Sequence, residues 1–377
     1  MSTSSISTKN KYLLWVKSGG RCEYRGCNKS LTQDILTKHN FNQSYIAHIV
    51  ADVPGGPRGC TTRSALLGDD INNLMLLCDT HHRLIDKHDV AGHPEALLLD
   101  MKKEHEDRIE RVTTIAPDME SHIVTYTANI GANTPVVTYE SVREYLLPSH
   151  YPAQSSAIGL GLTNSAGKDI NPTFWSTEIE NLETQFNDQL RTKLRTNQIS
   201  HISLFALAPM PLLMKLGTLL NDIQKIEIHQ PTRNPKTWNL LDDQDQVQYL
   251  VNKPNNVTKV PIVLNISLSA TITNDRITQV LGDDCSIYTL TIPTPSNDYL
   301  KNKIHLEDFS IIIRQLFNEI KAIHGQETEL HIFPAMPVAT AIEFGRIWMP
   351  KADMSLVIYD QNTALGGFVK AIEIRNG

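Results

Sequence analysis

Short apolar runs alternate with longer amphipathic segments along residues 151–377. The runs at 202–206 and 262–271 are typical of buried strands, whereas 178–197 and 306–324 carry apolar residues at helical spacing. Further strands are expected at 156–163, 225–229, 286–292, 330–333 and 355–359. Because strands that alternate with helices build parallel sheets, this part of the chain is predicted to be an α/β domain with a largely parallel sheet.

Two segments of this α/β part resemble each other. Residues 202–217 read ISLFALAPMPLLMKLG, and residues 330–345, 128 positions later, read LHIFPAMPVATAIEFG. Phe205, Pro209, Leu216 and Gly217 then pair with Phe333, Pro337, Phe344 and Gly345. A duplication predicts two similar halves side by side. Because open α/β sheets bind ligands at the ends of their strands, the strand ends of both halves are expected to face a common ligand. The alternative is that a strand, a loop and a helix that starts with proline are a common local pattern.

The N-terminal part has a different pattern. Two apolar strands are expected at 45–50 and 72–77, and a helix at 81–88 follows them. A second helix, 96–112, ends this part. The strand–loop–strand–helix order predicts a small α+β domain. The chain is thus divided into a domain over 1–111, a connector over 112–150 and the α/β domain over 151–377.

Composition and charge narrow the possible functions. Of 377 residues, 41% are hydrophobic and 20% are charged, as in ordinary globular proteins. The net charge of −6 divides into +3 over residues 1–90 and −9 over the remainder, which excludes a uniformly basic nucleic-acid coat but permits a local basic face. The most apolar window, 204–220, contains two prolines and is short for a membrane span. No signal-peptide core is visible at the N-terminus, so a cytoplasmic protein is expected.

Four of the five cysteines lie close together in the N-terminal part, which in a cytosolic chain indicates a metal site more than disulfides. Cys22-x4-Cys27 and Cys78-x2-His81 together supply three thiolates and one imidazole. This donor set is typical of a tetrahedral structural Zn²⁺ site. The alternative is a group of unrelated buried cysteines. Two further cysteines lie outside both pairs and are expected to be spectators: Cys60 and Cys285.

The zinc pairs interleave with a second pattern. His48 lies on the first expected strand, Asn73 at the start of the second, and His82 on the following helix. This zinc-clipped His–Asn–His order resembles the HNH endonuclease family, which has a ββα-metal fold. The resemblance implies that His48 is the general base of phosphodiester hydrolysis, that Asn73 fixes the base or its loop, and that His82 ligates a catalytic Mg²⁺.

One position departs from the HNH pattern. Many HNH proteins carry an acidic metal ligand just before the first histidine, and this chain has Ala47 there. Asp52 and Asp86 are candidates for the second ligand by proximity alone. Because phosphate contacts give affinity without sequence preference, weakly specific cleavage of double-stranded DNA is expected. The basic residues expected to contact DNA phosphates are Arg58, Arg83 and Lys87.

The C-terminal part resembles a SAVED domain, a sensor of cyclic oligonucleotides built from two fused CARF-like, Rossmann-type halves. The residues that carry this resemblance are LFALAPMPLLMKLG, IFPAMPVATAIEFGR and the later MSLVIYD. HNH followed by SAVED is similar to effector nucleases of bacterial CBASS antiphage systems. The resemblance implies that a cyclic di- or trinucleotide binds the sensor, and that ligand-dependent dimers or tetramers then degrade DNA in an abortive-infection response.

A cyclic oligonucleotide is a polyanion with flat bases, so its site needs cationic groups, aromatic faces and helix N-termini. The expected ligand-binding residues, chosen near strand ends, are Lys168, Trp175, Met210, Pro334, Met336 and Arg346. Two other functions remain open at this point. One is a restriction-type HNH nuclease whose C-terminal half reads modified DNA, and the other is a nucleotide-sensing regulator with an inactive HNH fold.

Overall fold

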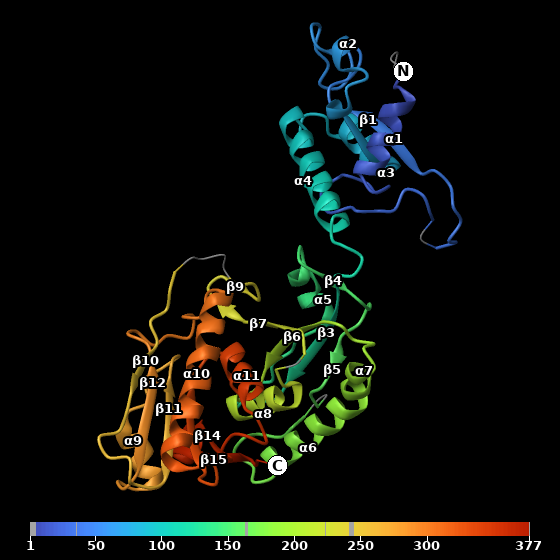
Figure 1. Ribbon diagram of the computed structural model, residues 1–377. Coiled ribbons are helices and arrows are strands. Elements are labelled where there is room, and N and C mark those ends of the chain that lie inside the picture. The colour runs from blue at the N-terminus through green and yellow to red at the C-terminus, as the bar shows by residue number, and fades with distance from the viewer. Residues whose placement is uncertain (1–4, 35, 163–164, 223, 241–244, 377) are drawn as a thin grey trace. The chain divides into compact units, whose positions relative to one another are not determined.

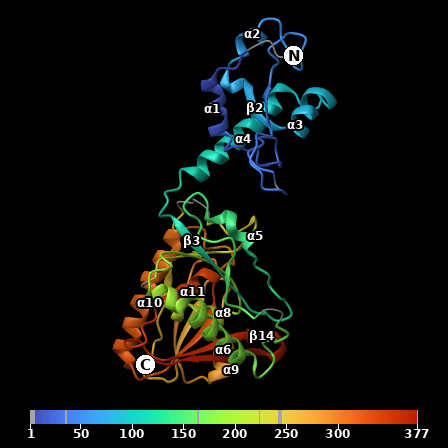
Figure 2. The ribbon, with the colours of Figure 1, turned by 90° about the vertical axis from the view of Figure 1, so that its right-hand side faces the viewer.

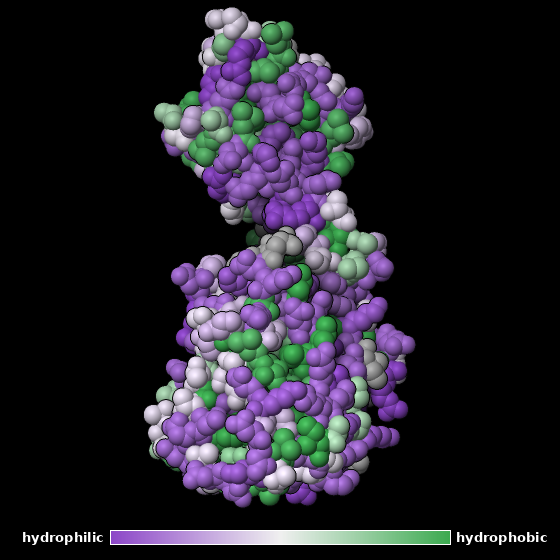
Figure 3. Space-filling view, turned by 60° about the vertical axis from the view of Figure 1, so that its left-hand side comes forward, coloured by the Kyte–Doolittle hydropathy of each residue, from purple (hydrophilic) through white to green (hydrophobic). Residues whose placement is uncertain are grey.

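The computed structural model describes residues 5–34, 36–162, 165–222, 224–240 and 245–376. The chain divides between Asp118 and Met119 into two compact units. Within the described residues, no helix combines the length and the apolar character that a membrane crossing requires. Hydrophilic side chains cover most of the face seen in Figure 3, and hydrophobic ones form scattered patches.

The first unit is a small α+β domain, as predicted (Figure 1). Its two strands pair antiparallel, with His48 opposite Leu74 and Ser44 opposite Cys78. One hydrophobic core joins this hairpin to the flanking helices through Leu14, Leu76 and Ile85. The elements are α1 (Thr8–Lys17), β1 (Ser44–His48), α2 (Ser64–Leu67), η1 (Ile71–Asn73), β2 (Leu74–Cys78), α3 (Asp79–Arg83), the π-helical turn η2 (Leu84–His88) and α4 (Glu95–Thr113).

The second unit contains two sheets rather than one. In the five-stranded sheet, β3 (Glu120–Thr127) pairs in parallel with β4 (Tyr151–Pro152), β5 (Ile158–Gly159) and β6 (Ile202–Leu207). The fifth strand, β7 (Ile226–His229), pairs in parallel with β6. Residues 112–150 are therefore not a connector, because β3 forms the middle of this sheet. The expected strand 156–163 shrinks to β5, and residue 163 lies outside the described residues.

The six-stranded sheet has the order β10-β12-β11-β13-β14-β15, with four parallel strands between two antiparallel edges. Its strands are β10 (Leu250–Asn252), β11 (Ile262–Ser267), β12 (Ser286–Thr291), β13 (Leu330–Ala335), β14 (Leu356–Asn362) and β15 (Gly367–Ile374). A short separate hairpin consists of β8 (Thr232–Arg233) and β9 (Lys236–Thr237).

Helices lie between the two sheets and on their outer faces (Figures 1 and 2). The inner helices share one large core with both sheets, in which Leu204 and Ile332 point inward. The helices and turns are α5 (Tyr139–Val142), η3 (Arg143–Leu146), α6 (Phe174–Phe186), η4 (Asn187–Arg191), α7 (Thr192–Arg195), α8 (Met210–Leu220), α9 (Asn274–Leu281), α10 (Lys303–His324), α11 (Val338–Ile347) and η5 (Thr363–Leu365). Smaller cores under α9 and under α5 with η3 cover the outer faces of the sheets.

The sequence repeat is also a structural repeat. Strand β6 and helix α8 start at Ile202 and Met210, and β13 and α11 start 128 residues later, at Leu330 and Val338. The paired phenylalanines occupy equivalent places. Phe205 stacks on His229 of the next strand at 4.1 Å between ring centroids, and Phe333 stacks on Tyr359 of its next strand at 4.3 Å.

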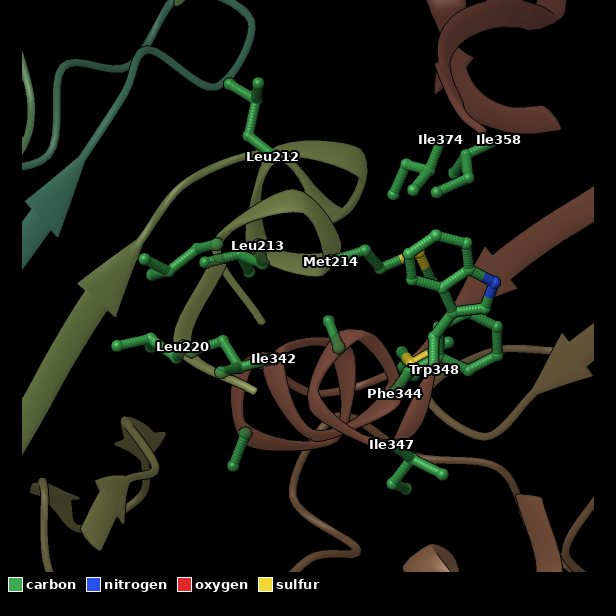
Figure 4. Close-up of a cluster of buried hydrophobic side chains, with 14 of the residues drawn as sticks. Leu212, Leu213, Met214, Leu220, Ile342, Phe344, Ile347, Trp348, Ile358 and Ile374 are labelled. Carbon is green, nitrogen blue, oxygen red and sulfur yellow. The ribbon is translucent and has the colours of Figure 1, made fainter. Parts of the chain in front are cut away.

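Helices α8 and α11 cross at the paired glycines of the repeat. A Cβ atom on Gly217 would lie 2.0 Å from the Ile342 carbonyl oxygen, and one on Gly345 would lie 1.9 Å from that of Met214. No side chain fits at either position, so the two backbones meet directly. Around this crossing, Leu213 and Met214 from α8 and Phe344 and Ile347 from α11 fill the core, together with Trp348 (Figure 4).

Candidate functional site

The first unit gathers the four predicted ligand residues. The ligand atoms of Cys22, Cys27, Cys78 and His81 all lie within 4.8 Å of one another. Nδ1 of His81 faces the sulfurs, 3.2 Å from Cys78 Sγ and 3.6 Å from Cys22 Sγ. Cys78 ends β2 and His81 lies on α3, so the strand-to-helix turn places two ligands beside the two that follow α1.

The chemistry of this cluster fits a bound Zn²⁺. Burial raises the pKa of the Cys22 thiol, and the neighbouring Cys78 and Cys27 add to this effect. A soft divalent cation would offset the cost of burying several thiolates together. The His81 ring is held by Tyr24, which stacks on it at 4.0 Å and whose hydroxyl is 2.9 Å from His93 Nε2.

Asn73 links the loop after β1 to the start of β2. Its Oδ1 accepts a hydrogen bond from the Val50 N–H at 2.8 Å, and its Nδ2 donates to the Val50 and Leu67 carbonyls at 2.8 and 3.1 Å. Asn73 is buried, so these bonds fix the backbone two residues beyond His48. Asn73 thus holds the loop that follows His48, and its role in catalysis stays a prediction.

The two histidines of the pattern have different surroundings. His48 Nε2 lies 2.9 Å from the Gly68 carbonyl; if Nε2 donates there, Nδ1 is the proton acceptor. His82 stacks on Tyr45 at 4.8 Å, and its Nε2 lies 3.4 Å from Asp86 Oδ2. Burial lowers the pKa of His82, which favours the neutral imidazole. Among the described residues, no hydrogen bond or ring contact joins His48 to His82.

Arg58 was predicted to contact DNA phosphates, but its guanidinium is used inside the unit. Nε donates to the Ile49 carbonyl at 2.5 Å, Nη1 to the Ile85 carbonyl at 2.8 Å and Nη2 to Asp86 Oδ1 at 2.7 Å. Only 7% of the Arg58 side chain is exposed. Arg58 therefore connects the end of β1 to the helical segment that carries His82. The other two predicted DNA contacts, Arg83 and Lys87, are exposed on that segment.

A cavity of about 800 Å³ lies in the second unit, where the loops after β6 and β13 meet. Four of the six expected ligand residues line it: Lys168, Met210, Pro334 and Met336. Gln230 also lines it, and its Oε1 accepts a hydrogen bond from the Ala339 N–H at 2.9 Å near the start of α11.

Trp175 and Arg346 were assigned wrongly to the ligand site. Trp175 is 9% exposed and packs edge-on against Phe174 in the core, at 5.1 Å. Arg346 donates to the Asn221 and Gln224 carbonyls and pairs with Glu343, so its charge is used within the unit.

Four charged residues of the cavity were not predicted: Asp169, Arg233, Asp298 and Asp360. Asp360 lies on β14, the neighbour of the repeat strand β13, and Arg233 follows β7, the neighbour of β6. Their places at the ends of neighbouring strands were the available signal. Burial raises the pKa of Asp360 to about 7, and the charge of Asp169 contributes.

Comparisons with known proteins agree with the α/β fold of the second unit. The family model of the SMODS-associated and fused to various effectors sensor domain, abbreviated SAVED, matches residues 182–374. Among curated proteins, none matches.

Similar solved structures include the Acinetobacter baumannii Cap4 SAVED/CARF-domain containing receptor with the cyclic trinucleotide 2′3′3′-cAAA, at 12% identity and a TM-score of 0.45, covering 74% of this chain and 62% of that one. The Moraxella osloensis Cap4 receptor gives 11% identity and a TM-score of 0.40, covering 74% and 60%. The chain thus spans less than two thirds of these receptors. Because the family model covers just over half of its residues, the chain belongs to the SAVED family.

Proposed function

We propose that this protein is a metal-dependent DNA endonuclease of bacterial CBASS antiphage defence, activated by a cyclic oligonucleotide. In this proposal the second unit binds the messenger and the first unit cleaves double-stranded DNA with little sequence preference. The observation that carries the nuclease assignment is the interleaving of the Cys22, Cys27, Cys78 and His81 cluster with His48, Asn73 and His82 on one ββα unit.

The sensor part of the proposal rests on family membership and on the cavity. The cavity has a volume of about 800 Å³, which is in the range of ligand sites, and it lies at the strand ends of both repeat halves. Lys168 and Arg233 line it and have no ion-pair partner within the described part of the chain, so both can receive phosphates. We infer that binding here promotes assembly of a dimer or tetramer.

The zinc cluster is assigned a structural role. The three sulfurs and the His81 imidazole complete a tetrahedral donor set, which leaves no open position for a substrate. The bound ion would hold the Cys22–Cys27 loop, the end of β2 and the start of α3 together. His82 follows His81 directly, so the same ion would also fix the segment that carries it.

The catalytic part is built around His48. Its free ring nitrogen would accept a proton from the attacking water, while Asn73 fixes the loop that follows. His82 and Asp86 would hold the Mg²⁺, because two donor atoms 3.4 Å apart can both bind one ion at about 2.1 Å. A bound Mg²⁺ supplies charge stabilisation at the scissile phosphate. Asp86 thereby takes the role of the acid absent at Ala47, and Arg58 holds its other oxygen.

The test uses plasmid DNA, Mg²⁺ and a panel of cyclic di- and trinucleotides. We expect cleavage by the native protein and no cleavage by His48→Ala. His39→Ala changes an exposed histidine of the same unit and should cleave like the native protein. Full activity of His48→Ala, with native-like unfolding, would reject the catalytic assignment. Tight binding of methylated duplex in place of cyclic oligonucleotides would favour the restriction-type alternative.

A further inference from the structure

The charges around the cavity do not match a site for phosphates alone. Two cationic residues line it, Lys168 and Arg233, but so do three acidic residues, Asp169, Asp298 and Asp360. A carboxylate near a phosphate is repelled, and the repulsion is stronger in a partly dry cavity than in water. The acidic side chains therefore need to face a part of the ligand that donates hydrogen bonds.

Asp360 and Asp169 both line the cavity, and they lie near enough for the charge of Asp169 to act on Asp360. Asp169 Oδ2 accepts a hydrogen bond from the Gly131 N–H at 3.2 Å, which fixes one of its oxygens. The partly buried Asp360 carboxyl accepts no hydrogen bond from any described residue. A polar group held away from water without a partner is costly, so a ligand that supplies a donor gains this free energy on binding.

The two carboxyls influence each other. Burial, with a smaller contribution from the charge of Asp169, raises the pKa of Asp360 to about 7. Above this pH the Asp360 carboxyl is ionised, and a carboxylate can only accept hydrogen bonds. A ligand group with N–H donors relieves the mutual repulsion, whereas a group with exposed oxygens increases it.

Building on the proposed cyclic-oligonucleotide ligand, we propose that Asp360 and Asp169 receive the amino-bearing edge of a nucleobase, while Lys168 and Arg233 hold the phosphates. Adenine and cytosine present an exocyclic amino group, and guanine presents an amino group beside an N–H. Uracil presents two carbonyl oxygens around a single N–H. The pair therefore selects rings that contain amino-bearing bases against rings that contain only uracil.

The experiment measures binding of full-length protein to cyclic di-AMP and cyclic di-UMP, and to the corresponding cyclic trinucleotides, at pH 8 without added Mg²⁺. Since one well-placed pair of hydrogen bonds gives about 1–3 kcal/mol of discrimination, which is about fivefold to 150-fold, we expect the adenine ring to bind at least about fivefold more tightly. Asp360→Ala should lose most of this preference, with weaker binding of the adenine ring and unchanged or tighter binding of the uracil ring. Asp188→Asn alters an exposed acid of the second unit outside the cavity and should keep the preference.

The outcomes separate this inference from the proposed function. Binding of no cyclic oligonucleotide by the native protein overturns both. If the rings bind but uracil is preferred, or if Asp360→Ala weakens both rings equally, the assignment of the acidic pair is wrong and the sensor function stands. A preference that appears only with added Mg²⁺ also overturns it, because a cation would then occupy the pair.

Discussion

The crossing of α8 and α11 allows a quantitative test of the repeat. In Gly217→Ala, the new Cβ would lie 2.0 Å from the Ile342 carbonyl oxygen and 2.8 Å from the Gly345 Cα. Both neighbours are backbone atoms, so the helices must separate by about 1 Å to reach ordinary contact distances, which weakens the packing of the surrounding core. Overpacking of this kind costs about 3 kcal/mol, and the better helix propensity of alanine returns about 1 kcal/mol.

We therefore expect Gly217→Ala to lower the free energy of unfolding of the second unit by about 2 kcal/mol or more. In urea unfolding followed by circular dichroism, this moves the midpoint of that unit's transition by roughly 0.7 M, taking a slope of about 3 kcal/mol/M. Gly345→Ala should behave alike, since its Cβ would lie 1.9 Å from the Met214 carbonyl oxygen. Gly159→Ala is the matched control, because its nearest contact would be Thr125 Oγ1 at 3.9 Å, and it should change stability by less than about 0.5 kcal/mol. Equal stability of Gly217→Ala and Gly159→Ala would refute the close crossing.

Three further predictions concern the metal cluster, Arg58 and pH. Cys78→Ser should remove bound zinc and unfold the first unit, whereas Cys60→Ser, outside the cluster, should retain one zinc per chain. Elemental analysis measures the zinc content of both variants. Equal zinc content in the two would contradict the ligand set. Arg58→Ala leaves Asp86 without its cation, so it should lower the free energy of unfolding by about 3 kcal/mol in thermal unfolding and reduce DNA cleavage. Arg83→Ala, on the exposed face, should not destabilise the unit. Similar effects of both variants would argue against the internal role of Arg58. Burial lowers the pKa of His229 and of His201 to about 4, so their contribution to stability is complete above about pH 6.5 and is lost as the pH falls toward 4. The loss is about 2 kcal/mol for each histidine at pH 5. His229→Phe, which can keep the stacking on Phe205, should reduce this loss in unfolding experiments at pH 7 and pH 5, and an unchanged pH dependence would show that other groups cause it.

Local spacing and short-range periodicity were enough to predict much of the fold. The four metal-ligand candidates form two pairs that are close in sequence, so a single turn brings the two residues of each pair together. Only the contact between the two pairs depends on the tertiary fold. The repeat could be read because the same strand, loop and helix recur 128 residues later, with the structural elements starting in register. The loops after β6 and β13 line the cavity, as expected because open α/β sheets bind ligands at the ends of their strands.

The errors arise from contacts between residues far apart in sequence. The sequence pattern predicts a connector where strand β3 lies, because the place of β3 in the sheet depends on pairing with β6, about 80 residues later. Arg58 and Arg346 were both expected to bind phosphates. Arg58 instead meets two carbonyls and a carboxylate from other segments, and Arg346 meets two carbonyls from distant residues and the Glu343 carboxylate on its own helix. Asp360 was missed because its neighbour in the cavity, Asp169, lies on a distant loop. A list of charged residues cannot show which charges are already paired.

Control of the nuclease by the sensor is measured as cleavage of supercoiled plasmid in the presence of Mg²⁺, before and after addition of the tightest-binding cyclic oligonucleotide. We expect intact plasmid without the ligand and progressive fragmentation once the ligand is added. Arg233→Glu, which reverses one of the two cavity cations, should require far more ligand for the same cleavage. Equal cutting with and without the ligand, or no cutting although the ligand is bound, would contradict an endonuclease controlled by its sensor.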